Sequence, residues 1–376
     1  MGPLGGVKVI EFTGLAPGPF AAMMLADMGA QVLRIDRPQQ RFRPLAPRFT
    51  LLDRNRRAIA VDIKTPKGVA LVRRLAKEAD ALIEGFRPGI MEKAGLGPDA
   101  LLELNPRLVY GRMTGWGQDG PLARVAGHDI NYIALTGALD AVGEAGRAPT
   151  IPLNLVGDLG GGGMYLAFGM ACALFQTGRS GRGQVVDAAM VDGAASLMTM
   201  FHGFLAAGRW AGRGGGMGGG NPAYRVYETS DGKYISIGAV EEPFYAELLR
   251  LTGLDDGSMP DRADRGNWPR IHERFASVFK AKTRDEWDSL LGHTDTCFAP
   301  VLDLDEAPDH PHNRHRGTYV EIDGIVQPAP APRFSRTVPE VPKAGVEPGV
   351  DLDAALAGWG FSADEIADLR SSGTAA

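Results

Sequence analysis

The feature that most constrains the fold is a regular alternation of short apolar segments with helical ones in the first part of the chain. Residues 7–12, 31–36 and 58–63 are apolar and rich in β-branched side chains, as strands are. Between them, residues 20–30 and 66–79 repeat apolar side chains at helical spacing. Strands that alternate with helices pair in parallel and carry helices on the faces of the sheet. We therefore predict an α/β fold with a parallel sheet.

A glycine-rich segment at residues 212–224 is the strongest domain boundary in the sequence. Seven of its residues are glycine, so no helix or strand persists there. After it, the pattern predicts a β-hairpin with a type I′ turn at Asp231-Gly232, followed by amphipathic helices. The predicted organisation is a large domain over 1–200, a helical and glycine-rich linker over 201–224, a small α+β domain over 225–305, a return linker over 306–330, and a helical tail over 331–376 that packs on the large domain.

The composition points away from nucleic acids and membranes as partners. The 376 residues carry a formal net charge of −5, so no excess of positive charge favours either polyanion. The longest apolar run, residues 164–175, is shorter than the roughly 20 residues that span a bilayer. The two cysteines cannot form a disulfide framework, and the first residues do not resemble a secretory signal. We expect a cytoplasmic protein that binds neither nucleic acid nor a membrane.

The segment from Arg34 to Arg57 concentrates positive charge in a chain that is acidic overall. It contains eight arginines against two acidic residues, a local charge of +6. Arginine forks bind phosphates bidentately, so a phosphate site is favoured over a solvated basic loop. Lys64 and Arg87 follow neighbouring strands and add to the same sheet edge, where ligands of α/β proteins bind. A dinucleotide is disfavoured because the first strand–helix turn, TGLAPGPF, lacks the G-x-G-x-x-G spacing.

His310, His312 and His315 form the only cluster of histidines in the sequence. Apart from Asp309, no cysteine or acidic residue stands at a ligand spacing from them. We interpret this segment as a solvated loop and expect no metal site.

His128 and Asp158 are the side chains best suited to acid–base chemistry. His128 precedes a helical segment, and a helix N-terminus disfavours the imidazolium, which leaves the ring neutral as a general base requires. Asp158 precedes glycines 160–163, whose N–H groups at a helix start would hold an oxyanion. The plainer alternatives are a core histidine and an N-cap aspartate. The pattern alone gives these alternatives equal weight.

Longer motifs are similar to those of CoA-transferase family III over nearly the whole chain. They are GLAPGPFAAMMLADMGAQVLRIDRP, RNRRAIAVDIK, LIEGFRPGIMEKAGLG, YGRMTGWGQDGPL, GHDINYIALTGAL, NLVGDLGGGGMYLAFGMACAL, GRGQVVDAAMVDG and APRFSRT. The resemblance implies a Rossmann-like large domain built from both ends of the chain, together with a small α+β domain. It also implies an interlocked homodimer that binds CoA rather than NAD.

Within this family, the Gly127-His128-Asp129 motif resembles the branch that racemises 2-methylacyl-CoA thioesters. That branch implies His128 and Asp158 as the two catalytic bases and Glu241 as a support for the histidine. Gly160 and Gly161 would support the oxyanion. No separate cofactor is implied, because CoA is part of the substrate. The implied CoA-contacting residues are Arg37, Val61, Asp62, Ile63, Lys64, Gly85, Phe86, Arg87, Lys93, Gly127, Asp129, Ile130, Asn131 and Tyr132.

The expected reaction interconverts (R)- and (S)-2-methylacyl-CoA by removing the α-proton and returning one to the opposite face of an enolate. The alternative is a CoA-transferase in which Asp158 attacks a thioester and forms an acyl-aspartyl anhydride. That chemistry has no use for a second proton-transfer group such as His128. The racemase carries one difficulty: a helix N-terminus favours ionised Asp158, yet half of the cycle needs it protonated. An apolar environment would have to raise its pKa.

Overall fold

The structure is a computed structural model that describes residues 2–38 and 45–376, and it divides into two compact units. Unit 1 consists of Met1–Thr136, Leu153–Thr199 and Arg314–Ala376, and unit 2 of Gly137–Pro152 and Met200–Asn313. The predicted small domain lies inside unit 2. Unit 2 also includes residues 137–152, which no feature of the sequence separates from the large domain.

Unit 1 is built on a six-stranded parallel sheet with the strand order β3-β2-β1-β4-β5-β6. The strands are β1 (Lys8–Phe12), β2 (Gln31–Asp36), β3 (Arg56–Ala60), β4 (Ala81–Glu84), β5 (Val109–Thr114) and β6 (Val185–Ala189). The order reverses between β1 and β4, which is the topological switch point of a Rossmann sheet. The predicted α/β fold with a Rossmann-like sheet is confirmed.

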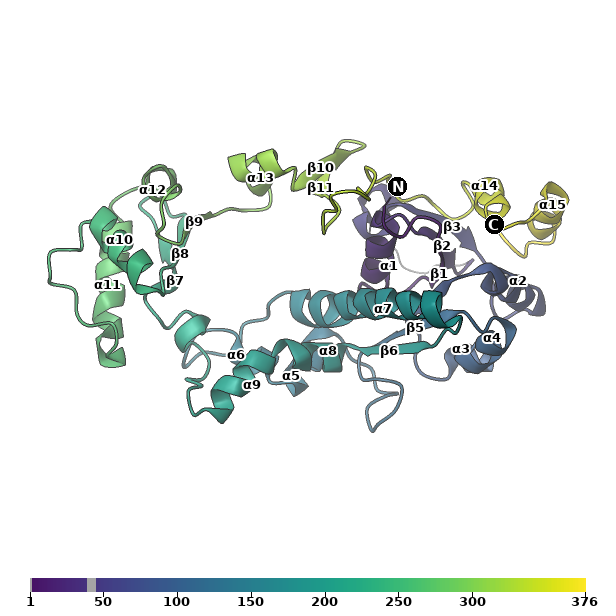
Figure 1. Cartoon of the computed structure of the whole chain (residues 1–376), viewed down its shortest axis with the longest axis horizontal. Helices are drawn as coiled ribbons and strands as arrows, with labels where there is room; N and C mark the ends of the chain where they lie inside the picture. Colours follow the sequence, from purple (N-terminus) through teal and green to yellow (C-terminus); the bar gives the residue numbers. More distant parts are fainter. Residues whose placement is uncertain (1, 39–44) are drawn as a thin grey trace. The chain divides into compact units, whose positions relative to one another are not determined.

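Helices cover both faces of this sheet (Figure 1). Successive strand residues point to opposite faces, so Ile10 packs in the core under α2 while its neighbour Val9 packs in the core under α1 and α7. The helices of unit 1 are α1 (Pro17–Asp27), α2 (Pro66–Glu78), α3 (Ile90–Lys93), α4 (Pro98–Leu104), α5 (Asp129–Leu135), α7 (Tyr165–Ser180), α8 (Met190–Leu197), α14 (Leu352–Ala357) and α15 (Ala363–Ser371), with 3₁₀ turns Pro47–Phe49 and Leu51–Asp53 and a π-helix Leu155–Met164.

The C-terminal tail completes the outer edge of the sheet beside β3 (Figure 1). Leu356, Trp359 and Ile366 of α14, α15 and their connection belong to the same buried core as α2. The backbone of Ala376 exchanges two hydrogen bonds with Ala60, of 2.7 and 3.1 Å. The end of the chain therefore acts as an added strand segment that covers an edge left open by β3.

Unit 2 contains an antiparallel sheet in the order β7-β8-β9, packed against helices through Phe275, Phe279 and Trp287. Its elements are β7 (Tyr224–Glu228), β8 (Tyr234–Gly238), β9 (Phe298–Val301), α6 (Ala138–Ala141), α9 (Thr199–Ala206), α10 (Glu242–Thr252), α11 (Trp268–Phe279) and α12 (Arg284–Leu291), with 3₁₀ turns Gly216–Gly218, Arg265–Asn267 and Ala307–Asp309. The β7–β8 turn is not type I′, because Gly232 has positive φ and Asp231 does not.

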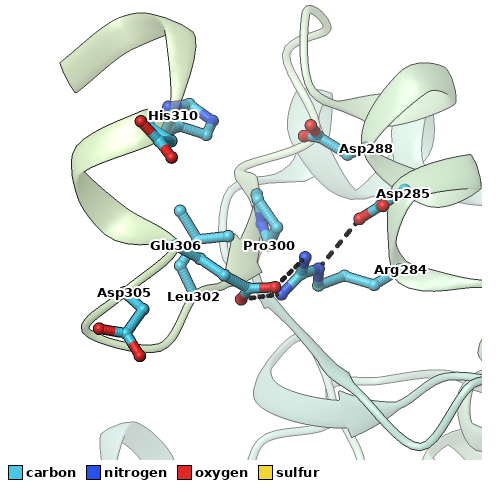
Figure 2. Close-up of a pocket in the computed structure, with 9 residues that line it drawn as sticks. Arg284, Asp285, Asp288, Pro300, Leu302, Asp305, Glu306 and His310 are labelled. Carbon is cyan, nitrogen blue, oxygen red and sulfur yellow. Dashed lines mark hydrogen bonds and ion pairs between the residues drawn. The ribbon is translucent and has the colours of Figure 1, made fainter. Parts of the chain in front are cut away.

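Figure 2 shows a cavity of about 380 Å³ in unit 2, beside the end of β9. Its central feature is the guanidinium of Arg284, which donates to both carboxylate oxygens of Glu306 at 2.5 and 2.9 Å. Lys233 reaches the same carboxylate at 2.6 Å. Through these ion pairs, Glu306 in the segment after β9 is bound to α12 and to the residue that precedes β8. We therefore interpret this site as structural.

The return linker is more ordered than the sequence predicted. It contains α13 (Pro311–Arg316) and a hairpin of β10 (Tyr319–Ile322) and β11 (Ile325–Pro328). Buried Arg54 donates to Gln327 Oε1 and to the Pro328 carbonyl, at 3.1 and 2.6 Å, and so fastens β11 to unit 1. The interpretation of the histidine segment as a loop is wrong for residues 311–316, where Pro311 begins a helix.

The glycines at 160–163 do not form a loop, because the π-helix and α7 run on as one helix, Leu155–Ser180. At 26 residues it is long and apolar enough to cross a membrane. Only length and composition support such a role, and core helices of globular proteins share both properties. Leu166, Ala167 and Met170 of this helix are buried against the sheet.

Candidate active site

His128 stands at the N-cap of α5, as the sequence predicted. Its backbone is extended, with φ −133° and ψ 173°, and its N–H donates to Asn131 Oδ1 at 3.0 Å. The bond satisfies one polar group at the helix start and fixes the residue that carries the imidazole. The ring itself is exposed, so it is free to meet a substrate.

Tyr132 and Trp116 hold the backbone just before His128. The Tyr132 hydroxyl donates to the Gly127 carbonyl, and the two rings meet edge to face with centroids 4.7 Å apart. A Cβ at Gly127 would lie 2.8 Å from the Tyr132 ring and 3.1 Å from Trp116, so only glycine allows this packing. The Tyr132–Trp116 pair therefore fixes the backbone conformation of the residue before His128.

Asp158 lies in the first turns of the π-helix, half-buried. Its Oδ2 accepts a hydrogen bond from Asn154 Nδ2 at 3.1 Å, and its backbone N–H donates to Asp129 Oδ2 at 2.7 Å. The side chain of Asp129, the first residue of α5, thus links the two segments that carry His128 and Asp158. Asn154 was not among the predicted site residues, although its spacing of four residues from Asp158 is a helical signal.

The glycines after Asp158 allow helices to pack closely. A Cβ at Gly161 would lie 2.6 Å from the backbone nitrogen of Ala194 in α8, and one at Gly163 would lie 2.9 Å from the Pro17 carbonyl in α1. Gly160 and Gly161 lie within the π-helix, whose N–H groups bond to carbonyls five residues earlier. Their predicted support of an oxyanion stays a prediction.

The protonation of Asp158 reflects its neighbours. Burial raises the pKa of its carboxyl above the usual value; the Asn154 hydrogen bond lowers it, the negative charge of Asp129 raises it and His128 lowers it. The pKa of Tyr132 is also raised, by burial and by Asp158, against the opposing charge of Arg87. His128, Asp158, Tyr132 and Arg87 therefore belong to one electrostatically coupled site. A helix start was expected to keep Asp158 ionised. The raised pKa of its carboxyl instead favours the protonated form that half of the cycle requires.

The predicted CoA-contacting residues of unit 1 follow the carboxyl ends of neighbouring strands. Arg37 follows β2, Val61 to Lys64 follow β3, and Gly85 to Arg87 follow β4. Arg37 is exposed and its guanidinium lies over the Phe86 ring, 5.5 Å from the centroid. Lys93 is exposed at the end of α3. Ligands of α/β sheets bind at this edge, next to the switch point.

Two backbone segments of this edge are held by carboxylates. Buried Glu84 accepts from the Phe86 N–H at 2.7 Å and from Arg112 Nε at 2.9 Å, which shapes the turn before Arg87. Asp62 Oδ1 accepts from the Lys64 N–H at 3.0 Å. The sequence analysis did not single out Glu84.

Three arginines of the arginine-rich segment form a buried ion-pair network rather than a phosphate site. Arg34 lies 2.9 Å from Asp36 and 2.5 Å from Asp53, and Arg54 lies 2.5 Å from Asp27. Arg56 pairs with Glu11 and with Asp53. Arg34, Arg54 and Arg56 are at most 4% exposed, so their guanidinium groups are unavailable to a ligand. The phosphate interpretation fails for these three, and Arg41 and Arg43 lie outside the described residues.

Glu241 lies in unit 2, at the N-cap of α10. Its negative charge contributes, after burial, to a raised pKa of the Cys297 thiol. Its support of His128 stays a prediction. Over residues 2–38 and 45–376, no three or more His, Cys, Asp or Glu side chains are grouped as metal ligands would be.

The sheet order, the residues at its carboxyl edge and the match of residues 4–351 to one sequence profile define the class: the chain belongs to CoA-transferase family III. Among individual relatives, mouse α-methylacyl-CoA racemase is 44% identical over 98% of this chain and 96% of its own length. The human racemase is 43% identical with the same coverage. Formyl-CoA:oxalate CoA-transferase of Escherichia coli O157:H7 is 30% identical over 98% of each chain. The crystal structure of a CaiB/BaiF family protein from Brucella suis superposes with a TM-score of 0.84 at 27% identity, covering 95% of this chain and 99% of that one.

Proposed function

We propose that this chain is an α-methylacyl-CoA racemase, an isomerase that interconverts the (R) and (S) forms of 2-methylacyl-CoA thioesters. The similarity to the mouse and human racemases supports this function over CoA transfer, since the similarity to the transferase is lower. The observation that carries the proposal is the presence of His128 and Asp158 in one coupled site, with burial raising the pKa of the Asp158 carboxyl.

Racemisation needs two groups that can each accept and donate a proton, one on each face of the α-carbon. For one enantiomer, neutral His128 accepts the α-proton while protonated Asp158 delivers a proton to the opposite face. For the other enantiomer the roles reverse. From the family resemblance we expect His128 to serve the (S) form and Asp158 the (R) form. The raised pKa of Asp158 supports the protonated state that half of the cycle requires.

The enolate oxygen also has to be stabilised, a contribution commonly worth ~3–4 kcal/mol. Gly160 and Gly161 are the predicted support. Because they lie inside the π-helix and allow its contact with α8, we expect them to act by holding that helix in place.

Binding of CoA is assigned to the carboxyl edge of the sheet. We expect Arg37, Lys64 and Arg87 to contact phosphates, because all three are exposed there and carry positive charge. Lys93 is a further candidate. No cofactor is needed, because CoA arrives with the substrate.

We further propose a homodimer, in which Glu241 would support His128 across the subunits. One face of α7 exposes Phe168 and Phe175, at 69% and 67%, preceded by Met164 at 44%. Large exposed apolar side chains on one helix face mark an interaction surface. We expect the enzyme to act in the cytoplasm, in fatty acid metabolism, without nucleic-acid or membrane partners.

Proton NMR of an enantiopure 2-methylacyl-CoA in D₂O with the purified protein tests this function. The α-proton signal should disappear while the opposite enantiomer accumulates. With the (S) form, whose proton His128 is expected to remove, His128→Ala should abolish both changes. His293→Ala, a matched control at an exposed histidine of unit 2, should preserve them. A protein that leaves the α-proton in place, but moves CoA to an added carboxylic acid, would instead be a transferase with Asp158 as nucleophile.

A further inference from the structure

The carboxylate of Asp129 joins the two catalytic segments, a role that CoA contact does not explain. Asp129 is only 6% exposed, so its side chain points into the protein rather than toward solvent. Its Oδ2 accepts the Asp158 N–H at 2.7 Å, within the short range of hydrogen bonds to a charged acceptor. The residue that follows His128 thus holds the backbone of the second base directly.

The absence of a side chain at Gly157 leaves room for the Asp129 carboxylate. Gly157 is buried, and a Cβ there would lie 2.5 Å from Asp129 Oδ2 and 2.8 Å from its Cγ. Any larger residue at 157 would push the carboxylate off the Asp158 N–H. The glycine and the carboxylate therefore form one fitted contact between α5 and the π-helix.

The second oxygen, Asp129 Oδ1, is buried and has no hydrogen-bond partner in the described part of the chain. A buried carboxylate with an unsatisfied oxygen destabilises a fold, so it calls for a functional explanation. Its negative charge acts on the neighbouring carboxyl: after burial and the Asn154 hydrogen bond, Asp129 is the next contributor to the pKa of Asp158, and it raises that pKa.

We propose that Asp129 is a positioning residue for racemisation: its buried carboxylate fixes the Asp158 backbone relative to His128 and places a second negative charge beside Asp158. This proposal rests on the proposed racemase function. The other groups facing this site are His128 and Tyr132 around the start of α5, Asn154 on the π-helix, and Arg87 after β4, which acts on Tyr132.

The test compares three variants with wild type in the full-length protein, by the pH dependence of kcat/KM for racemisation. Asp129→Asn keeps an acceptor for the Asp158 N–H but removes the charge. The pKa of Asp158 should then fall, and the acidic limb of the profile should move to lower pH. Both enantiomers require one proton on the His128–Asp158 pair and differ only in which residue carries it, so the limb should move equally for both substrates.

Gly157→Ala keeps the charge but displaces the carboxylate. We expect kcat to fall about tenfold or more, with KM changed much less and the acidic limb nearly in place. Asp99→Asn is the matched control, because Asp99 is also in the first turn of a helix but is exposed. It should leave kcat and the pH profile unchanged.

An acidic limb that stays in place in Asp129→Asn would overturn the electrostatic part of the proposal. An unchanged kcat in Gly157→Ala would overturn the positioning part. If Asp129→Asn does not fold, Gly157→Ala still decides positioning, and circular dichroism checks each fold. Absence of α-proton exchange in wild type would instead reject the racemase function, a failure seen without any variant.

Discussion

The arginine-rich segment 34–57 and the His128–Asp158 pair both predicted chemistry from sequence, but the structure uses their charges differently. In the arginine segment, Arg34, Arg54 and Arg56 are buried and paired with carboxylates. In the His128–Asp158 pair, an exposed imidazole and a half-buried carboxyl influence each other through their charges, and the carboxyl accepts a hydrogen bond from the Asn154 amide. The buried arginines are therefore occupied by carboxylates inside the fold, whereas His128 and Asp158 are at least partly exposed and can be reached by a substrate.

The largest expected effect comes from removing one of the two bases. Asp158→Asn keeps the size of the side chain and its contact with Asn154 but cannot take up the α-proton. We expect racemisation to fall by about three orders of magnitude, the middle of the range for general acid–base catalysis, with Tm little changed. Chiral analysis of the product measures it. A residual rate above about one tenth of wild type would remove Asp158 from the mechanism.

For the buried ion pairs we expect a loss of stability with little change in activity. Arg56→Ala leaves Glu11 buried without its partner and should lower the free energy of unfolding by about 3–5 kcal/mol, measured by urea denaturation. The kcat of the folded fraction should stay within about twofold of wild type. Adding Glu11→Gln should recover part of the lost stability. A large loss of kcat at unchanged stability would make this network part of the active site.

A smaller effect, on substrate binding alone, should distinguish the exposed arginines Arg37 and Arg48. Arg37→Ala should raise the KM for the acyl-CoA about tenfold with little change in kcat, because one phosphate contact is lost. Arg48→Ala is the matched control, since Arg48 is exposed in the same segment but lies over Phe49. Equal changes in both variants would mean that the segment acts only through its overall charge.

The smallest effect is expected for an exposed pair, Arg74 with Glu365. Hydrogen bonds from Arg74 and from the Ser362 backbone lower the pKa of Glu365 to about 2. A lowered pKa means that this carboxylate stabilises the fold above about pH 4.5, and that the contribution is lost as the pH falls toward 2. Glu365→Gln should therefore lower Tm slightly at pH 7 and not at pH 2, in thermal scans at both values. A difference that persists at pH 2 would contradict this assignment.

The fold was largely predictable because its signals are local. The alternation of apolar strands and helices fixed the parallel sheet, and the position of His128 before an apolar helix fixed its place at the start of α5. The sequence could not show that Arg34, Arg54 and Arg56 are paired, because two of their partners, Glu11 and Asp27, lie on earlier elements outside the segment whose charges were counted.

The surroundings of the site were less predictable for the same reason. Glycines after Asp158 are typical of a loop, but here they let a helix approach α1 and α8, two elements far away in the sequence. The contact of Asp129 with Asp158 joins residues 29 positions apart, so no local sequence pattern predicts it. The return hairpin, by contrast, has a local signal that was overlooked: Asp323-Gly324, both with positive φ, form the two-residue turn between β10 and β11.

The central claim is that His128 and Asp158 act as separate bases on opposite faces of the α-carbon. The most direct measurement is α-proton exchange in D₂O for each pure enantiomer of a 2-methylacyl-CoA with His128→Asn and with Asp158→Asn. Neither variant should racemise, but each should still exchange the proton of one enantiomer, and the two variants should retain opposite enantiomers. If both variants retain exchange of the same enantiomer, or if either racemises at the wild-type rate, the two-base account is wrong.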